Sequence, residues 1–163
     1  MISPTTGELR FSDGWRLRPQ DPMGAIFDRV LATRDLPIPE WRLHDVGVHS
    51  SEFGDFEVGA VCGPDQRVCL VTLTHRHTFY EASTVADGER RVYHESILAT
   101  DLKGQREYPW GEAFCRFDAQ DHKDRLVIAY TGGSHIPHQV AEVLLNLEEH
   151  ERFEQSRGSE RRG

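Results

Sequence analysis

The sequence predicts an α+β fold, in which an antiparallel β-sheet meander carries about three helices packed mainly on one face. Segments of alternating apolar and polar residues are joined by short turns rich in Gly and Asp, which is typical of antiparallel hairpins. Other segments carry apolar residues at the spacing of a helix. The 163 residues suffice for one compact domain. We expect this domain over residues 1–155 and a disordered tail over residues 156–163.

The N-terminal segment predicts a hairpin followed by a helix. Residues 2–18 alternate apolar and polar side chains around Asp13 and Gly14, a dipeptide that favours a hairpin turn. Asp21 and Pro22 then suit an N-cap and the first position of a helix. The apolar residues that follow have helical spacing and predict one buried face: Met23, Ile26, Phe27, Val30 and Leu31.

The rest of the chain predicts five more strands and two more helices. The strands are expected over residues 41–49, 56–62, 68–79, 112–118 and 125–131. A second helix is expected over residues 87–103, capped by Asp87 and ended by Gly104. A last helix begins at Pro137 and has an apolar stripe formed by Val140, Val143, Leu144 and Leu147.

The hairpin of residues 56–62 and 68–74 permits a prediction of register. A four-residue loop places Cys62 opposite Arg67 and Phe56 opposite Leu73. Asp55 and Glu57 then face solvent, whereas a slip of one residue would bury both. The face predicted to be buried consists of Phe56, Val58, Cys69, Val71 and Leu73.

Composition excludes several classes of function. The net charge is −8, which argues against binding to nucleic acid or to an anionic membrane surface. We find no apolar run of membrane-spanning length and no signal-peptide pattern at the N-terminus, so we expect a cytoplasmic location. The three cysteines form no CxxC motif and are expected to be reduced and buried: Cys62, Cys69 and Cys115.

Negative charge is concentrated between Asp35 and Glu57. This stretch holds six acidic residues and one arginine, so it contributes −6 + 1 = −5 of the net −8. It is either a solvated edge that resists aggregation or a surface that docks a basic partner. The docking interpretation gives a set of candidate contact residues: Glu40, Trp41, Asp45, Glu52, Phe53 and Asp55.

The stretch LTHRHTFYE, residues 73–81, raises the question of a metal site. His75 and His77 lie two apart on one face of a predicted strand, and His49, Glu81 or His94 can supply a third ligand. No HExxH motif or Cys/His cluster accompanies them. Three interpretations stay open: structural histidines at the sheet rim, an acid–base pair, or a metal site formed by His75, His77 and His94. We expect no cofactor.

The stretch TGGSHIPHQ, residues 131–139, places a Gly-rich turn between a strand and a helix. Backbone N–H groups in such a turn can bind an anion, and Ser134 or His135 can act as a nucleophile or base. The known phosphate-binding and nucleophile motifs do not occur here. A turn with Ser134 as a helix cap also explains the sequence.

Three segments resemble a group of small, uncharacterised bacterial proteins, some of which lie beside toxin systems. The segments are ISPTTGELRFSDGWRLRP, FEVGAVCGPDQRVCLVTLT and GQREYPWGEAFCRFDAQDHKDRLVIAY, and together they cover roughly two-fifths of the chain. The helix-and-hairpin unit is also similar to the β-lactamase-inhibitor-protein type of module. Both resemblances imply a binding protein, and the first implies an immunity protein that blocks a toxin without catalysis.

Together these observations predict a non-enzymatic, cytoplasmic binding protein of the immunity or antagonist type. It would dock a basic toxin or effector through the acidic stretch, with Trp41 or Phe53 as an aromatic anchor. The alternatives are a small metal-dependent hydrolase that uses His75 and His77, and a homo-oligomeric scaffold. The sequence identifies neither the partner nor the oligomeric state.

Overall fold

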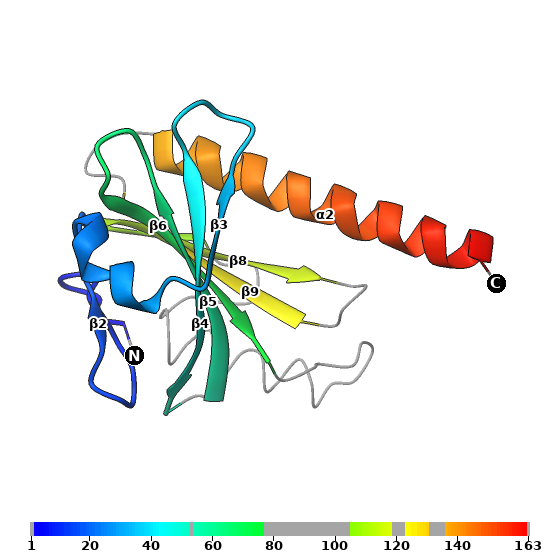
Figure 1. The fold of residues 1–163 in the computed structure, drawn as a ribbon. Coiled ribbons are helices and arrows are strands. Elements are labelled where there is room, and N and C mark those ends of the chain that lie inside the picture. The colour runs from blue at the N-terminus through cyan, green and yellow to red at the C-terminus, as the bar shows by residue number, and fades with distance from the viewer. Residues whose placement is uncertain (1, 53, 77–104, 119–122, 131–135, 163) are drawn as a thin grey trace.

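The computed structural model describes residues 2–52, 54–76, 105–118, 123–130 and 136–162 (Figure 1). Seven antiparallel strands form one sheet in the order β3-β4-β5-β6-β9-β8-β7, and β1 and β2 form a separate small hairpin. The strands are β1 Leu9–Arg10, β2 Arg16–Leu17, β3 Ala32–Asp35, β4 Arg42–Ser51, β5 Gly54–Cys62, β6 Val68–His75, β7 Gln105–Tyr108, β8 Gly111–Asp118 and β9 Lys123–Ala129. The helical elements are two short 3₁₀ turns, η1 Met23–Ala25 and η2 Phe27–Arg29, and the helix α2 Ile136–Arg162.

The predicted α+β fold with about three helices on one face is wrong. The structure is mostly antiparallel sheet, and α2, with 27 residues, is its one α-helix within the described ranges. The segment predicted to form the first helix contains the 3₁₀ turns η1 and η2 instead. The second predicted helix, residues 87–103, lies outside the described residues. The hairpin within residues 2–18, the strands and the last helix are confirmed.

Tertiary hydrogen bonds explain why the first predicted helix does not form. The Met23 N–H donates to the carbonyl of Gln66 at 2.8 Å, and the Leu31 N–H donates to the carbonyl of Asp45 at 2.8 Å. In an α-helix the Leu31 N–H would donate to the carbonyl of Phe27, so its bond to β4 prevents the last turn of the predicted helix from closing. The Met23 bond ties the start of the segment to the turn between β5 and β6. The apolar spacing is also misleading, since the side chains of Phe27 and Leu31 are 68% and 73% exposed.

One face of the seven-stranded sheet packs against the N-terminal segment. The strands contribute alternate residues to this face, and the β1–β2 hairpin and Ile26 cover it. Its buried members include Leu9, Phe11, Trp15, Leu17, Ile26, Phe56, Val58, Val71, Leu73, Leu126, Ile128 and Tyr130. The N-terminal segment therefore covers one face of the sheet, a role that the sequence analysis assigned to helices.

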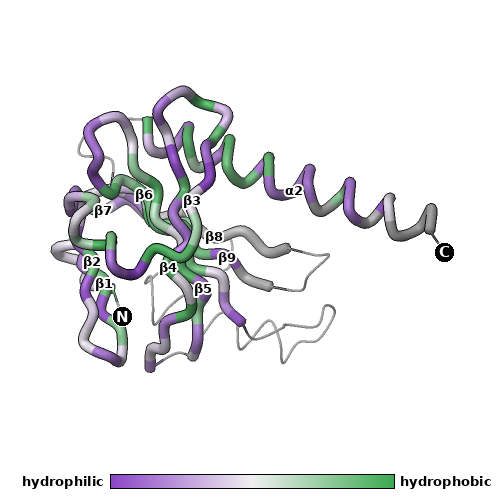
Figure 2. The backbone as a smooth tube through the Cα atoms, viewed as in Figure 1, coloured by the Kyte–Doolittle hydropathy of each residue, from purple (hydrophilic) through white to green (hydrophobic). Residues whose placement is uncertain are grey.

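The opposite face of the sheet packs against the first half of α2. The sheet contributes the other set of alternate residues, and α2 contributes four side chains that are at most 2% exposed. This cluster includes Leu36, Val61, Leu70, Phe114, Val127, Ala129, Val140, Ala141, Leu144 and Leu145. Figure 2 shows hydrophobic residues along the first turns of α2 and mainly hydrophilic residues further along the helix, where it extends away from the sheet. None of the described helices has an apolar stretch long enough to cross a membrane.

The register of β5 and β6 differs from the prediction by two residues. Phe56 pairs with His75 rather than with Leu73, and Val58 pairs with Leu73. The shift has two parts of one residue each: at the turn Cys62 pairs with Val68 rather than with Arg67, and a bulge at Cys69 changes the register again between Cys62 and Val61. The total shift beyond the bulge is even, so the side chains there keep their predicted faces, whereas Cys69 in the bulge does not.

The predicted burial pattern is therefore largely confirmed. Phe56, Val58, Val71 and Leu73 are buried on the hairpin face, and Asp55 and Glu57 are exposed. Cys69 is buried on the opposite face instead. Cys62 and Cys69 are free, buried thiols, and burial raises the pKa of Cys62 to about 11.

Two aromatic residues fix the N-terminal segment to the sheet. The buried Tyr130 hydroxyl donates to the carbonyl of Gly7 at 2.9 Å, and the Trp110 indole N–H donates to the carbonyl of Pro4 at 3.0 Å. Burial raises the pKa of the Tyr130 hydroxyl, which therefore stays a donor. A Cβ at Gly7 would lie 2.6 Å from Trp110 Cδ2, so only glycine permits this contact.

We predict that Gly7→Ala lowers the free energy of unfolding more than Gly14→Ala does. Both glycines have a positive φ, +75° and +89°, so both substitutions carry a cost of about 1–2 kcal/mol for the left-handed backbone. Gly14 has open space around its Cβ position, so the difference between the variants measures the clash with Trp110. Urea denaturation of the two variants is the measurement, and equal losses would contradict the contact.

Candidate binding groove

The face of the sheet that carries α2 changes from apolar to polar along its strands. Cross-strand pairing defines three successive rows on this face. The rows are Leu43, Val61, Leu70 and Ala129; then Asp45, Gly59, Thr72 and Val127; then Val48, Glu57, Thr74 and Arg125. Part of the first row belongs to the core cluster that contains α2, whereas polar side chains of the second and third rows line an open hollow.

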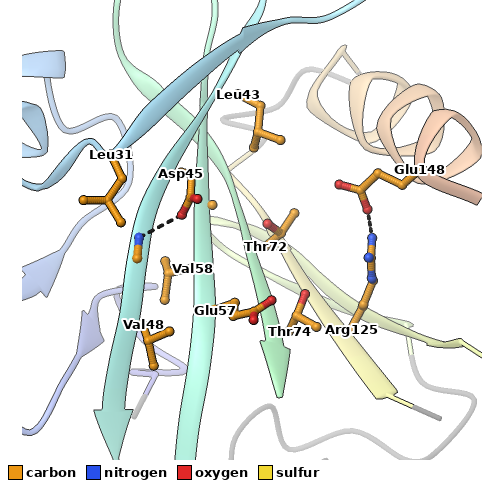
Figure 3. A pocket seen from close by; sticks show the side chains of 12 residues that line it. Leu31, Leu43, Asp45, Val48, Glu57, Val58, Thr72, Thr74, Arg125 and Glu148 are labelled. Atoms are coloured by element: carbon orange, nitrogen blue, oxygen red, sulfur yellow. Dashed lines mark hydrogen bonds and ion pairs between the residues drawn. The ribbon is translucent and has the colours of Figure 1, made fainter. Parts of the chain in front are cut away.

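The hollow is a groove of about 450 Å³, which we call the binding groove (Figure 3). It is lined by Leu31, Leu43, Asp45, Gly47, Val48, Glu57, Val58, Gly59, Thr72, Thr74, Arg125 and Glu148. Its residues come from β4, β5, β6 and β9, with Leu31 from the segment before β3 and Glu148 from α2.

Two glycines shape the groove. Gly59 lies in the middle of β5, where a Cβ would approach Thr72 Oγ1 to 2.7 Å and Leu43 Cδ1 to 3.0 Å. The floor at this point is therefore backbone rather than side chain. Gly47 has φ +85° and lies in an irregularity of β4 between Asp45 and Val48, where its N–H donates to Asp45 Oδ1 at 2.9 Å. This irregularity bends β4 and changes the direction of its second half.

The groove carries net negative charge. It contains three carboxylates and one guanidinium, which gives −3 + 1 = −2. Arg125 forms an ion pair with Glu148 of α2, and these side chains are only 17% and 20% exposed (Figure 3). Asp45 and Glu57 are exposed, and neither forms an ion pair within the described residues. The negative charge of the groove is thus located mainly on the side of β4 and β5.

Aliphatic side chains form part of the groove rim. Leu31 is 73% exposed and Val48 is 46% exposed, which are high values for large apolar residues. A Cβ at Gly47 would lie 3.1 Å from Leu31 Cδ1, so Leu31 lies directly over the irregular part of β4. Exposed apolar groups beside unpaired charge are typical of surfaces that bind other proteins.

The structure separates the six residues that the sequence analysis proposed as one contact surface. Asp45 lines the groove, and Asp55 lies on β5 two residues before Glu57, where it accepts a hydrogen bond from Ser50 Oγ at 2.6 Å. Glu52 lies in the turn between β4 and β5. Phe53 lies outside the described residues.

Glu40 and Trp41 lie at the other end of β4. The strand has ten residues and spans roughly 33 Å, so it separates these two from Glu52. Trp41 is half-buried, since its ring packs against Gly63 and against the core cluster under α2. The linear acidic stretch therefore does not form one continuous surface.

The sequence analysis did not assign several of the groove residues to a site. Glu57 was predicted to face solvent but not to be part of a site, and Thr72 and Thr74 were not assigned to one. Arg125 and Glu148 come from segments far along the chain, and no local pattern connects them to β5. Leu31 was assigned to a buried helix face, which concealed its exposure.

The two candidate metal ligands that the structure describes, His49 and His75, do not line the groove. His75 is 4% exposed and lies on the hairpin face of the sheet, where its ring meets the edge of Phe56 at a centroid distance of 4.8 Å. His77, His94, Ser134 and His135 lie outside the described residues. Within the part of the chain that the structure describes, no three His, Cys, Asp or Glu side chains group as metal ligands.

No family model and no curated protein matches this chain. Among solved structures, one described as Rhs1-CT in complex with cognate immunity protein RhsI1 matches with a TM-score of 0.48 and 12% sequence identity. The match covers 82% of this chain and 88% of that chain. A likeness of this size establishes neither a shared function nor a shared partner.

We predict that Glu148→Gln lowers the free energy of unfolding by about 1–3 kcal/mol, because the largely buried Arg125 then loses its carboxylate. Glu154→Gln makes the same change on the exposed part of α2 and should alter stability by less than about 0.5 kcal/mol. Urea denaturation monitored by tryptophan fluorescence measures both. Equal stability of the two variants would show that the ion pair does not hold α2 against the sheet.

Proposed function

We propose that this chain is a non-enzymatic binding protein that takes a basic partner protein in the binding groove. The observation that carries the proposal is the pair of exposed carboxylates, Asp45 and Glu57, in a groove of about 450 Å³. Neither has an ion-pair partner among the described side chains. Lysine or arginine side chains of a partner would supply the missing positive charge.

The groove combines the two features that protein interfaces need. Its carboxylates attract a basic surface over a distance of about 8–10 Å at physiological ionic strength and so raise the association rate. Its aliphatic rim, Leu31 and Val48, offers apolar area that becomes buried on contact and slows dissociation. The polar floor formed by Thr72 and Thr74 can accept hydrogen bonds from the partner.

An immunity or antagonist role is our proposal for what this binding achieves. A chain of net charge −8 that covers a basic surface of a toxin or effector would mask the residues by which that protein meets its own target. The resemblance of three segments to small proteins beside toxin systems supports the same role. We propose a cytoplasmic location because the same resemblance is to small bacterial proteins beside toxin systems.

The hydrolase hypothesis receives no support from the placement of its first ligand. His75 is 4% exposed, and its ring contacts Phe56 on the face of the sheet opposite to the groove. We therefore retain the binding function as our proposal.

A kinetic experiment tests the binding surface once the partner has been captured from the source organism. Asp45→Lys and Glu57→Lys should lower the association rate by about tenfold and reduce its salt dependence, because they reverse charge in the groove. Leu31→Ala should act mainly on the dissociation rate and cost on the order of 1–2 kcal/mol of binding free energy. Surface plasmon resonance over a salt series measures these rates.

The matched control for these variants is Glu40→Lys. It makes the same charge reversal on an exposed residue of the original acidic stretch, but at the other end of β4. We expect its association rate to stay close to that of the unmodified protein. An effect of Glu40→Lys as large as that of Asp45→Lys would indicate general charge attraction and would contradict a binding site in the groove.

A further inference from the structure

Arginine side chains cover the outer face of the β1–β2 hairpin. Leu9 pairs with Leu17 across this hairpin, and both are fully buried against the sheet. Because side chains alternate along a strand, the residues beside them point outward. These are Glu8, Arg10, Arg16 and Arg18, and the three arginine side chains are 49–65% exposed.

Glu8 holds the three guanidinium groups by their Nε atoms. Its Oε1 lies 2.7 Å from Arg10 Nε and 3.8 Å from Arg16 Nε, and its Oε2 lies 3.0 Å from Arg18 Nε. The hydrogen bond from Arg10 is the main cause that lowers the pKa of Glu8. Within the described residues, the terminal nitrogens of these guanidinium groups form no hydrogen bond. Those nitrogens remain available to bind oxyanions in the forked geometry that arginine favours.

The hairpin face carries net positive charge on an acidic protein. Three arginines and one glutamate give +3 − 1 = +2, against a net charge of −8 for the whole chain. Arg10 and Arg16 are directly opposite each other in the pairing of β1 with β2. Like charges in this position destabilise a strand pair, so a bound anionic surface would relieve their repulsion.

We propose that this arginine face binds the acidic groove of a second copy of the chain. The charges match, since the hairpin face carries +2 and the binding groove carries −2. The donors and acceptors match as well. The groove offers the exposed carboxylates of Asp45 and Glu57, and the hairpin offers guanidinium nitrogens to bind them.

The placement of the two surfaces determines the form of the assembly. The hairpin packs on one face of the seven-stranded sheet and the groove lies on the other, so each copy presents both surfaces at once. A contact between different surfaces is heterologous, so it adds copies head to tail and gives a ring if the rotation between copies closes, or an open chain if it does not. A basic partner in the groove would compete with this contact, but self-association itself does not depend on the proposed function.

Sedimentation velocity of the protein alone tests the proposal. At low salt the weight-average mass should rise with concentration above the chain mass of 18.6 kDa. About 0.5 M salt should return it to that mass, because exposed charges are then strongly screened. Arg10→Gln/Arg16→Gln should remain monomeric, and so should Asp45→Asn/Glu57→Gln. A wild-type protein that is monomeric at every concentration at low salt would overturn the proposal.

Mixing the two neutralised variants gives the decisive result. One variant keeps an intact groove and the other an intact hairpin, so the mixture should form a pair that cannot extend, with at most twice the 18.6 kDa chain mass. Arg42→Gln/Arg157→Gln, which removes two positive charges elsewhere, should associate like the wild type. A mixture that stays monomeric would overturn the proposal. So would association like that of the wild type by Arg10→Gln/Arg16→Gln alone or by Asp45→Asn/Glu57→Gln alone. Thermal unfolding confirms that each variant is folded.

Discussion

The packing of α2 on the sheet ends part-way along the strands, and the binding groove depends on this limit. The helix buries Val140, Ala141, Leu144 and Leu145 against one end of the sheet. Beyond these residues it becomes polar, and the strands become polar at the same level. Full coverage by an apolar helix would require the row of Glu57, Thr74 and Arg125 to be apolar as well, since unpaired buried charge is costly.

Ion pairs rather than apolar contacts hold α2 where it passes the groove. Glu148 pairs with Arg125 of β9, and Glu151 pairs with Arg34 of β3, so contacts reach both the middle and the edge of the sheet. At its start the helix is held by His138, which contacts the buried Glu112 of β8. These contacts fix one wall of the groove and neutralise Glu148. The carboxylates that remain uncompensated are those of β4 and β5, away from the helix.

The sequence predicted the strands well because their signal is local. The predicted faces of Phe56, Val58, Val71 and Leu73 were correct despite a register shift, since the turn and the bulge at Cys69 each moved the pairing by one residue and together by two. The helical spacing of residues 23–31 was misleading, because hydrogen bonds to Gln66 and Asp45 come from distant parts of the chain. The site was predicted only in part, because contacts between distant parts of the chain leave no local pattern in the sequence. Asp45 was found in the acidic stretch, but its neighbours in space, Arg125 and Glu148, were not.

We propose that the carboxylates of the groove, and not the acidic stretch as a whole, contact the partner. Carbodiimide labelling of carboxyl groups, read by mass spectrometry with and without the bound partner, tests it most directly. We expect binding to protect Asp45 and Glu57 from labelling, because partner cations then cover them. Glu40 and Glu154, both exposed and outside the groove, should stay reactive. Protection of Glu40 with unchanged labelling of Asp45 and Glu57 would contradict the account.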